Sequence, residues 1–125
     1  MGIVTAGKDL ILDMTFGLNS QTKINSMGVG TDSTAFAAGQ TKLNPTVSGS
    51  VLLQALDGGF PSRSAEVVTC QSTFATGVAN FQWNEIGLFN GTTNGTSTML
   101  NRIVIGPFTK TSAVSIVAVV TITQS

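Results

Sequence analysis

The chain has 125 residues, of which 42% are hydrophobic and only 10% are charged, and six basic side chains balance six acidic ones. This length suits one domain with its own core, and the balanced charge leaves no basic patch large enough to bind nucleic acid. With no histidine and a single cysteine, the sequence also lacks an imidazole base, an internal disulfide and the ligands of a zinc site.

The first fifty residues predict one helix, one strand and a long loop. Residues 8–16 are rich in apolar side chains and precede Gly17, so we expect a short helix that Thr5 caps and Gly17 ends. A brief strand is expected over residues 24–29. Residues 31–50 are mostly polar and contain Gly39, Pro45 and Gly49, which is typical of a loop with local turns.

The rest of the chain predicts short strands separated by turns. A strand is expected over residues 51–56, followed by a turn cluster, and stronger strands over residues 66–74 and from residue 81 onward. Two Asn-Gly pairs, at 90–91 and 94–95, predict an exposed hairpin loop. The next strand covers residues 99–105 and is expected to end at Gly106-Pro107, because proline cannot continue a central ladder.

The strand that starts at residue 81 contains a change of parity. Phe81 and Trp83 share one face, whereas the later apolar positions are Ile86 and Leu88, so the alternation slips at Asn84-Glu85. A one-residue slip turns over every later side chain unless a bulge absorbs it. We therefore predict a β-bulge there, with Trp83 in the core.

The last strand, residues 113–123, has one apolar face and one mixed face. This pattern suits the middle of a sandwich sheet, or a contact between subunits. Together these elements predict a mainly β protein: a single β-sandwich-like domain over residues 1–125, with about seven or eight short antiparallel strands and little helix near the N-terminus.

The search for reactive groups favours a non-enzymatic protein without a cofactor or metal. Cys70 lies in an apolar run and is expected to be a buried, inert thiol. Glu85, among apolar neighbours, is expected to be partly buried and hydrogen-bonded at the bulge, because no second acid is identifiable as a catalytic partner. Phe36 and Phe60 lie in polar or glycine-rich loops and are candidate contacts with a partner.

Three motifs carry a resemblance to a known group of proteins. They are a strand that ends in Glu-x-Gly-Leu-Phe (85–89), a Met-Leu-x-Arg strand (99–102) and a Thr-Lys-Thr link (109–111) into the last hydrophobic strand. With an early Gly-x-Gly-Thr segment (28–31), they resemble the small structural proteins of tailed phages, which act in capsid decoration or as tail-fibre-like or collar modules. The motif residues are Trp83, Glu85, Gly87, Phe89 and Arg102. The likeness covers residues 24–35 and 65–125, and the sequence departs from the pattern at Ala35-Phe36, where an Ala-Pro step is usual.

The resemblance implies a protein of the virion, made in the host cytoplasm and without a membrane segment. The favoured function is that of a capsid decoration, or cement, protein that stabilises the lattice of the major capsid protein. Its low charge favours association with its own copies, and we expect a homo-oligomer, as a trimer. The alternative is a tail-fibre or collar module that binds a host surface.

Overall fold

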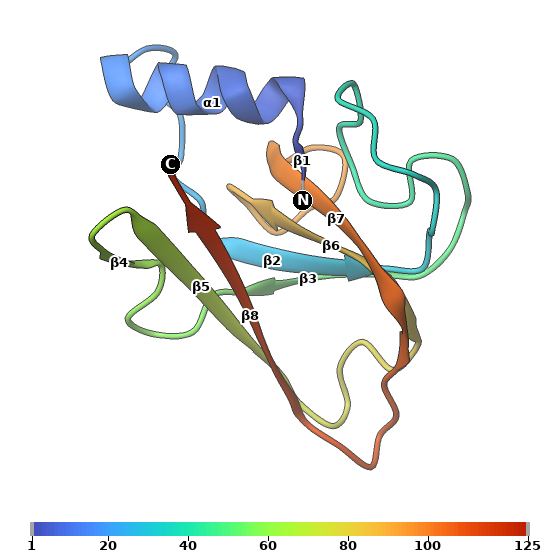
Figure 1. Ribbon diagram of the computed structural model, residues 1–125. Helices are drawn as coiled ribbons and strands as arrows, with labels where there is room; N and C mark the ends of the chain where they lie inside the picture. Colours follow the sequence, from blue (N-terminus) through green and yellow to red (C-terminus); the bar gives the residue numbers. More distant parts are fainter. Residues whose placement is uncertain (1, 125) are drawn as a thin grey trace.

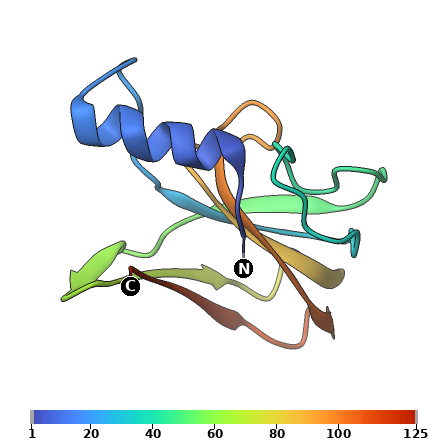
Figure 2. The same ribbon diagram turned by 45° about the horizontal axis from the view of Figure 1, so that its top comes forward.

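The computed structural model describes residues 2–124, which form one helix and eight strands in two packed sheets (Figures 1 and 2). In chain order the elements are β1 (Gly2–Ile3), α1 (Thr5–Phe16), β2 (Ser26–Gly30), β3 (Val51–Ala55), β4 (Ser62–Ser64), β5 (Val67–Phe74), β6 (Gln82–Phe89), β7 (Met99–Thr109) and β8 (Ile116–Thr123). All strand pairs are antiparallel. The prediction of a mainly β, sandwich-like fold is confirmed.

The main core lies between a five-stranded sheet of order β1-β7-β6-β2-β3 and a three-stranded sheet of order β4-β5-β8. Alternate residues of each strand point into this space, as the period of two requires. The core is built from Met27, Val29, Cys70, Phe74, Ala79, Trp83, Leu88, Leu100 and Val120. Cys70 is buried as predicted, and its burial raises the pKa of its thiol.

The expected bulge is present between β6 and β7. Trp83 pairs with Phe108 and Glu85 pairs with Val104, so residues 105–107 of β7 face Asn84 alone. The prediction that this strand ends at Gly106-Pro107 is wrong, because β7 continues to Thr109. Proline is tolerated there because it lies within the bulge, where the regular ladder is already interrupted.

The last strand, β8, lies at an edge and not in the middle of its sheet, which corrects one of the two readings of its sequence. It pairs with β5 from Val67↔Thr123 to Phe74↔Ile116, and none of the strands in the described part of the chain pairs with its other side. Its even-numbered residues turn toward the core, and Val117 and Val119 are exposed on the other face.

The helix α1 packs on the five-stranded sheet through a small residue. A Cβ at Gly7 would clash with the backbone of Leu100, so glycine lets the helix lie directly on β7, with Leu10 buried beside it. Gly17 ends α1 in the left-handed conformation (φ 66°), as predicted. The N-cap is Val4 and not Thr5, and the backbone N–H of Thr5 donates instead to the carbonyl of Ala38 at 2.8 Å.

The loop of residues 31–50, here called the covering loop, forms a partial third layer on the outer face of the five-stranded sheet (Figure 1). Its Leu43 is fully buried with Val4, Phe89 and Met99 in a second apolar cluster. A Cβ at Gly28 of β2 would lie 2.9 Å from side-chain atoms of Leu43 and Phe89. The glycines of β2 therefore leave room for the covering loop.

Candidate functional site

The centre of the outer face is a buried ion pair. The register of β6 and β7 places Gly87 opposite Arg102, so that Glu85, two residues along β6, is a diagonal neighbour of Arg102 on the same face. The Arg102 Nε donates to Glu85 Oε1 at 2.7 Å, and neither side chain is exposed to solvent. The expectation that Glu85 is buried and hydrogen-bonded beside the bulge is confirmed, and its burial is complete.

Both members of the pair hold the backbone of the covering loop. Glu85 Oε2 accepts hydrogen bonds from the backbone N–H groups of Asn44 (2.8 Å) and Asp32 (3.1 Å). The Arg102 guanidinium donates to the carbonyl oxygens of Thr34 (2.7 Å) and Asp32 (3.1 Å), and to Gln40 Oε1 (3.3 Å). Buried charges need this degree of hydrogen bonding, since an unpaired one is costly. The pair therefore fastens the loop to the sheet.

Two side chains of the covering loop, Asp32 and Asn44, complete this network. Asn44 Oδ1 accepts hydrogen bonds from the backbone N–H groups of Thr31 and Asp32, both at 3.1 Å. The Asp32 carboxylate accepts from the N–H of Thr34 (2.8 Å) and from the N–H and hydroxyl of Thr46 (3.1 and 3.0 Å). Burial acts to raise the pKa of Asp32, but these hydrogen bonds outweigh it and lower the pKa to about 2. Asp32 is thus held as a carboxylate.

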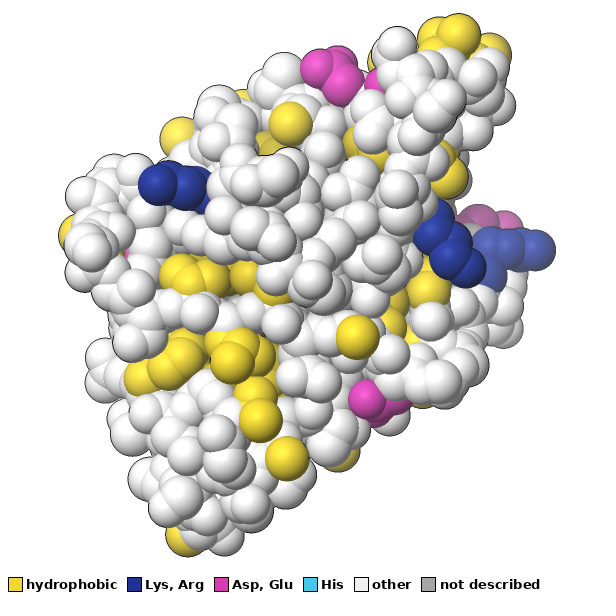
Figure 3. All heavy atoms as spheres, turned by 180° about the vertical axis from the view of Figure 1, so that it is seen from behind, with side chains coloured by type: hydrophobic (Ala, Val, Ile, Leu, Met, Phe, Trp, Pro, Cys, Tyr) yellow, Lys and Arg dark blue, Asp and Glu magenta, His cyan; other side chains and the backbone are white. Residues whose placement is uncertain are grey.

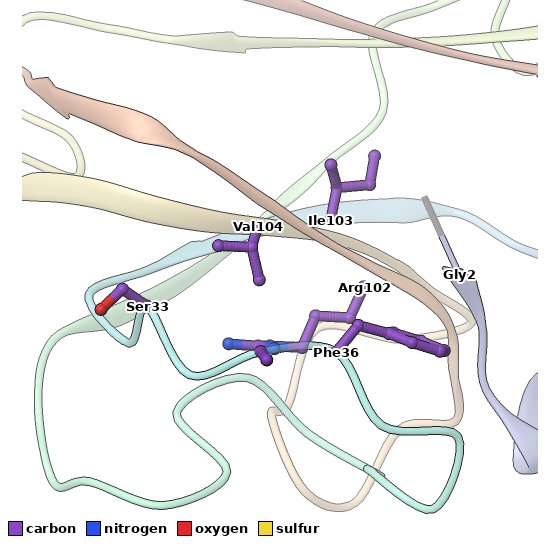
Figure 4. A pocket seen from close by; sticks show the side chains of 7 residues that line it. Gly2, Ser33, Phe36, Arg102, Ile103 and Val104 are labelled. Carbon is purple, nitrogen blue, oxygen red and sulfur yellow. The ribbon is translucent and has the colours of Figure 1, made fainter.

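Next to the ion pair lies a hollow with a volume of about 560 Å³ (Figure 4). Its lining comes from β1, the covering loop and β7, and consists of Gly2, Ser33, Ala35, Phe36, Arg102, Ile103 and Val104. The Phe36 ring lies over Gly2, where a Cβ would clash with it, and 39% of the side chain stays exposed. Phe36 is therefore accessible to a partner, as a contact anchor must be.

The other candidate residues are not gathered at this hollow. Trp83 is a core residue, as predicted: its ring contacts Phe74 edge-on (centroids 4.9 Å apart), and its Nε1 donates to the carbonyl of Ala79 at 3.0 Å. Phe89 is buried in the second apolar cluster, and a Cβ at Gly87 would lie 2.8 Å from the carbonyl oxygen of Asn101. Phe60 is half-buried between β3 and β4.

Four polar residues with structural contacts were not predicted from the sequence: Asp32, Asn44, Asn94 and Lys110. Asp32 and Asn44 lie in a polar loop where nothing in the local pattern marks them as buried. Lys110, from the Thr-Lys-Thr link, is also buried, and its Nζ donates to the Ala75 carbonyl and to Asn80 Oδ1, both at 2.7 Å. A signal for Asn94 was available in the Asn-Gly loop: its side-chain amide exchanges two hydrogen bonds with the backbone of Leu43, at 2.9 and 3.0 Å.

No family model matches this chain, and no curated protein or solved structure is significantly similar to it. Within residues 2–124, no cluster of three or more His, Cys, Asp or Glu side chains could hold a metal ion. In the same residues, no helix has the length and hydropathy needed to cross a membrane.

Proposed function

We propose that this protein is a non-enzymatic structural protein of a phage particle, where it decorates the capsid by binding the major capsid protein. It is made in the host cytoplasm and acts in the virion. The motif residues Glu85 and Arg102 support a scaffold role, because each makes its contacts inside the protein and has no exposed surface for a substrate.

The observation that carries this proposal is the exposed apolar surface of a domain with little charge. One group, here called the helix surface, lies on and just after α1 and consists of Ile11, Leu12, Met14, Phe16 and Leu18. Exposed apolar side chains also lie on both sheets: Val104 of β7 beside the covering loop, Val117 and Val119 on the outer side of β8, and Phe108 and Val114 near the connection of β7 and β8. Phe16 is 69% exposed, which is costly for an isolated domain in water. Such surfaces are typical of contacts with other proteins.

The space-filling view from behind (Figure 3) shows the end of α1 but not the exposed side of β8, which faces the viewer in Figure 1. Hydrophobic side chains gather in a band across the middle of the face seen from behind, and again at its upper right, where α1 ends. Charged side chains are few on this face, and most of the basic ones gather at its right edge (Figure 3). A surface of this kind favours broad apolar contacts over the charge-steered binding of a polyanion.

The second candidate is a tail-fibre or collar module that binds a host surface. The exposed Phe36 beside the hollow favours this alternative, because an aromatic at the rim of a hollow is suited to binding a small part of a receptor. The two functions differ in stoichiometry.

Counting copies in purified particles tests the proposal. A decoration protein is expected at a copy number close to that of the major capsid protein, whereas a fibre or collar module is present in only a few copies. Quantitative mass spectrometry of intact particles, with the major capsid protein as internal reference, gives this ratio. A ratio of a few per cent, or absence from the particle, would overturn the decoration proposal.

A further inference from the structure

The strand β8 has an unprotected edge. Eight residues long, it is hydrogen-bonded to β5 on one side, and no strand within the described residues 2–124 pairs with its other side (Figures 1 and 2). No side chain between residues 111 and 124 is charged. Natural edges are commonly protected by short length, charge, proline or a bulge, because unpaired N–H and C=O groups otherwise recruit another strand.

The other edges of the two sheets are shorter or interrupted, although β3 also lacks charged side chains. The edge strands β1 and β4 have two and three residues, and β3 has five. The part of β7 beyond β1 contains Gly106, Pro107 and the bulge opposite Asn84. Among the edge strands of residues 2–124, β8 is the one that combines a length of eight residues, regular pairing and the absence of charge, so its edge is the best suited to pair with another strand.

We infer that a second copy of this chain covers it, by adding its own β8 antiparallel to the first. The result is a continuous six-stranded sheet of order β4-β5-β8-β8-β5-β4 across two copies. A strand without charged side chains is suited to meet itself, since self-pairing places identical side chains close together without like-charge repulsion. This inference gives a specific form to the self-association expected from the sequence, and it does not depend on where in the particle the protein acts.

The pleat restricts the register of the pair. The core-facing residues of both copies must share one face, so the numbers of paired residues must sum to an even value. A two-fold axis at Val119 satisfies this rule and pairs Ile116 with Ile122 on the core face. On the exposed face it sets the two Val119 side chains against each other and Val117 against Thr121. An axis at Ala118 would pair Val117 with Val119 but would keep only residues 116–120 of β8 in the ladder, whereas axes at Val119 and Val120 keep residues 116–122 and 117–123. Of these two longer registers, the axis at Val120 would pair each exposed valine with a threonine, so we assign the axis to Val119.

The exposed valines supply the apolar contact for this pairing. Val117 and Val119 are 55% and 54% exposed in the single chain, and they form one row of aliphatic side chains across the proposed junction. Backbone hydrogen bonds then supply the orientation, as in other cases of strand addition. The pair has two-fold symmetry, so a trimer would have to use another surface, such as the helix surface.

Cysteine cross-linking of the full chain tests the register. In Val119→Cys the two thiols would lie on directly opposed residues, at a distance that a disulfide can bridge, and we expect a covalent dimer on mild oxidation. Val117→Cys alone should cross-link poorly, whereas an equimolar mixture with Thr121→Cys should cross-link well. The wild-type chain, whose one cysteine is buried, is the control.

A charge substitution tests the pairing without cysteine. Val119→Lys should weaken dimerisation at least about tenfold in sedimentation equilibrium, while Val47→Lys, at a similarly exposed valine of the covering loop, should leave it unchanged. Circular dichroism shows whether each variant is folded. A wild-type monomer at high concentration, a trimer without the Val119→Cys cross-link, or equal cross-linking of Val117→Cys and Val119→Cys would each overturn the inference. None of these results bears on the copy number in the particle, which tests the proposed function separately.

Discussion

Glu85 and Arg102, 17 residues apart in the chain, form a fully buried ion pair of 2.7 Å that joins two strands to the covering loop. Glu85 binds Arg102 through Oε1 and accepts hydrogen bonds from the loop backbone through Oε2. Arg102 binds Glu85 through Nε and donates to loop carbonyls through its two terminal nitrogens. Removing either charge would leave the other uncompensated, together with loop groups that have lost their partner.

We expect Glu85→Gln and Arg102→Met each to lower the free energy of unfolding by about 3–5 kcal/mol, as is usual when one member of a buried pair is removed. The double variant should lose less than the sum of the two, because it leaves no unpaired charge. Urea denaturation of the three variants measures this. The control is Glu66→Gln, at an exposed residue. Additive losses would contradict the structural coupling.

The pKa of Asp32 predicts part of the acid sensitivity. Its pKa is about 2 in the folded chain against an ordinary value of 3.8, so the folded state favours the carboxylate. This stabilisation is fully present above pH 3.8 and is lost as the pH falls through 2. In Asp32→Asn, stability should therefore fall less steeply with pH across this window, as measured by thermal unfolding at a series of pH values.

The wild-type chain, measured over the same pH values, gives the reference slope. Asp57 gives a second comparison, because hydrogen bonds from Gln71 and Thr73 also lower the pKa of its carboxyl. Asp57→Asn should change the acid slope in the same direction as Asp32→Asn. An unchanged slope in Asp32→Asn would show that its hydrogen bonds do not persist in solution.

Gly30→Ala should loosen the covering loop. A Cβ at this position would clash with the carboxylate of Glu85 and lie 3.1 Å from Asn44 Oδ1, so the network must shift. Crowding of this kind costs about 1–3 kcal/mol. Gly39→Ala, in the covering loop itself, is the control because its Cβ would meet nothing within 4 Å. Hydrogen exchange at Asp32 and Asn44 should speed up in the first variant only.

The strands were predictable from sequence because their signal is local. Alternation marks β5 and β8, and the parity slip between Trp83 and Ile86 marks the bulge, since a period of two is visible within a few residues. The position of β8 within its sheet depends on distant strands and leaves no local signal. Its apolar pattern was compatible both with the middle of a sheet and with a contact between subunits. Likewise, Pro107 ends a regular ladder but not a bulged one.

The network beneath the covering loop was only partly predictable, because its contacts are distant in sequence. Glu85 was marked by its apolar neighbours, but its partners Asn44 and Asp32 lie 41 and 53 residues away. A polar loop gives no periodic signal to show that it will be buried against a sheet. The same holds for Lys110, whose partners Ala75 and Asn80 lie 35 and 30 residues away.

The last prediction concerns the particle. Particles without this protein should assemble and package DNA, and then break at a lower temperature or a milder osmotic shock than complete ones. A protein that binds only the intact lattice stabilises it by mass action. Several modest apolar contacts then act together, because once one is made the others are held at high effective concentration. Adding purified protein back should restore resistance and saturate at a fixed ratio to the major capsid protein. If the deleted particles proved equally robust but failed to adsorb to cells, the decoration proposal would be wrong and the fibre or collar module would replace it.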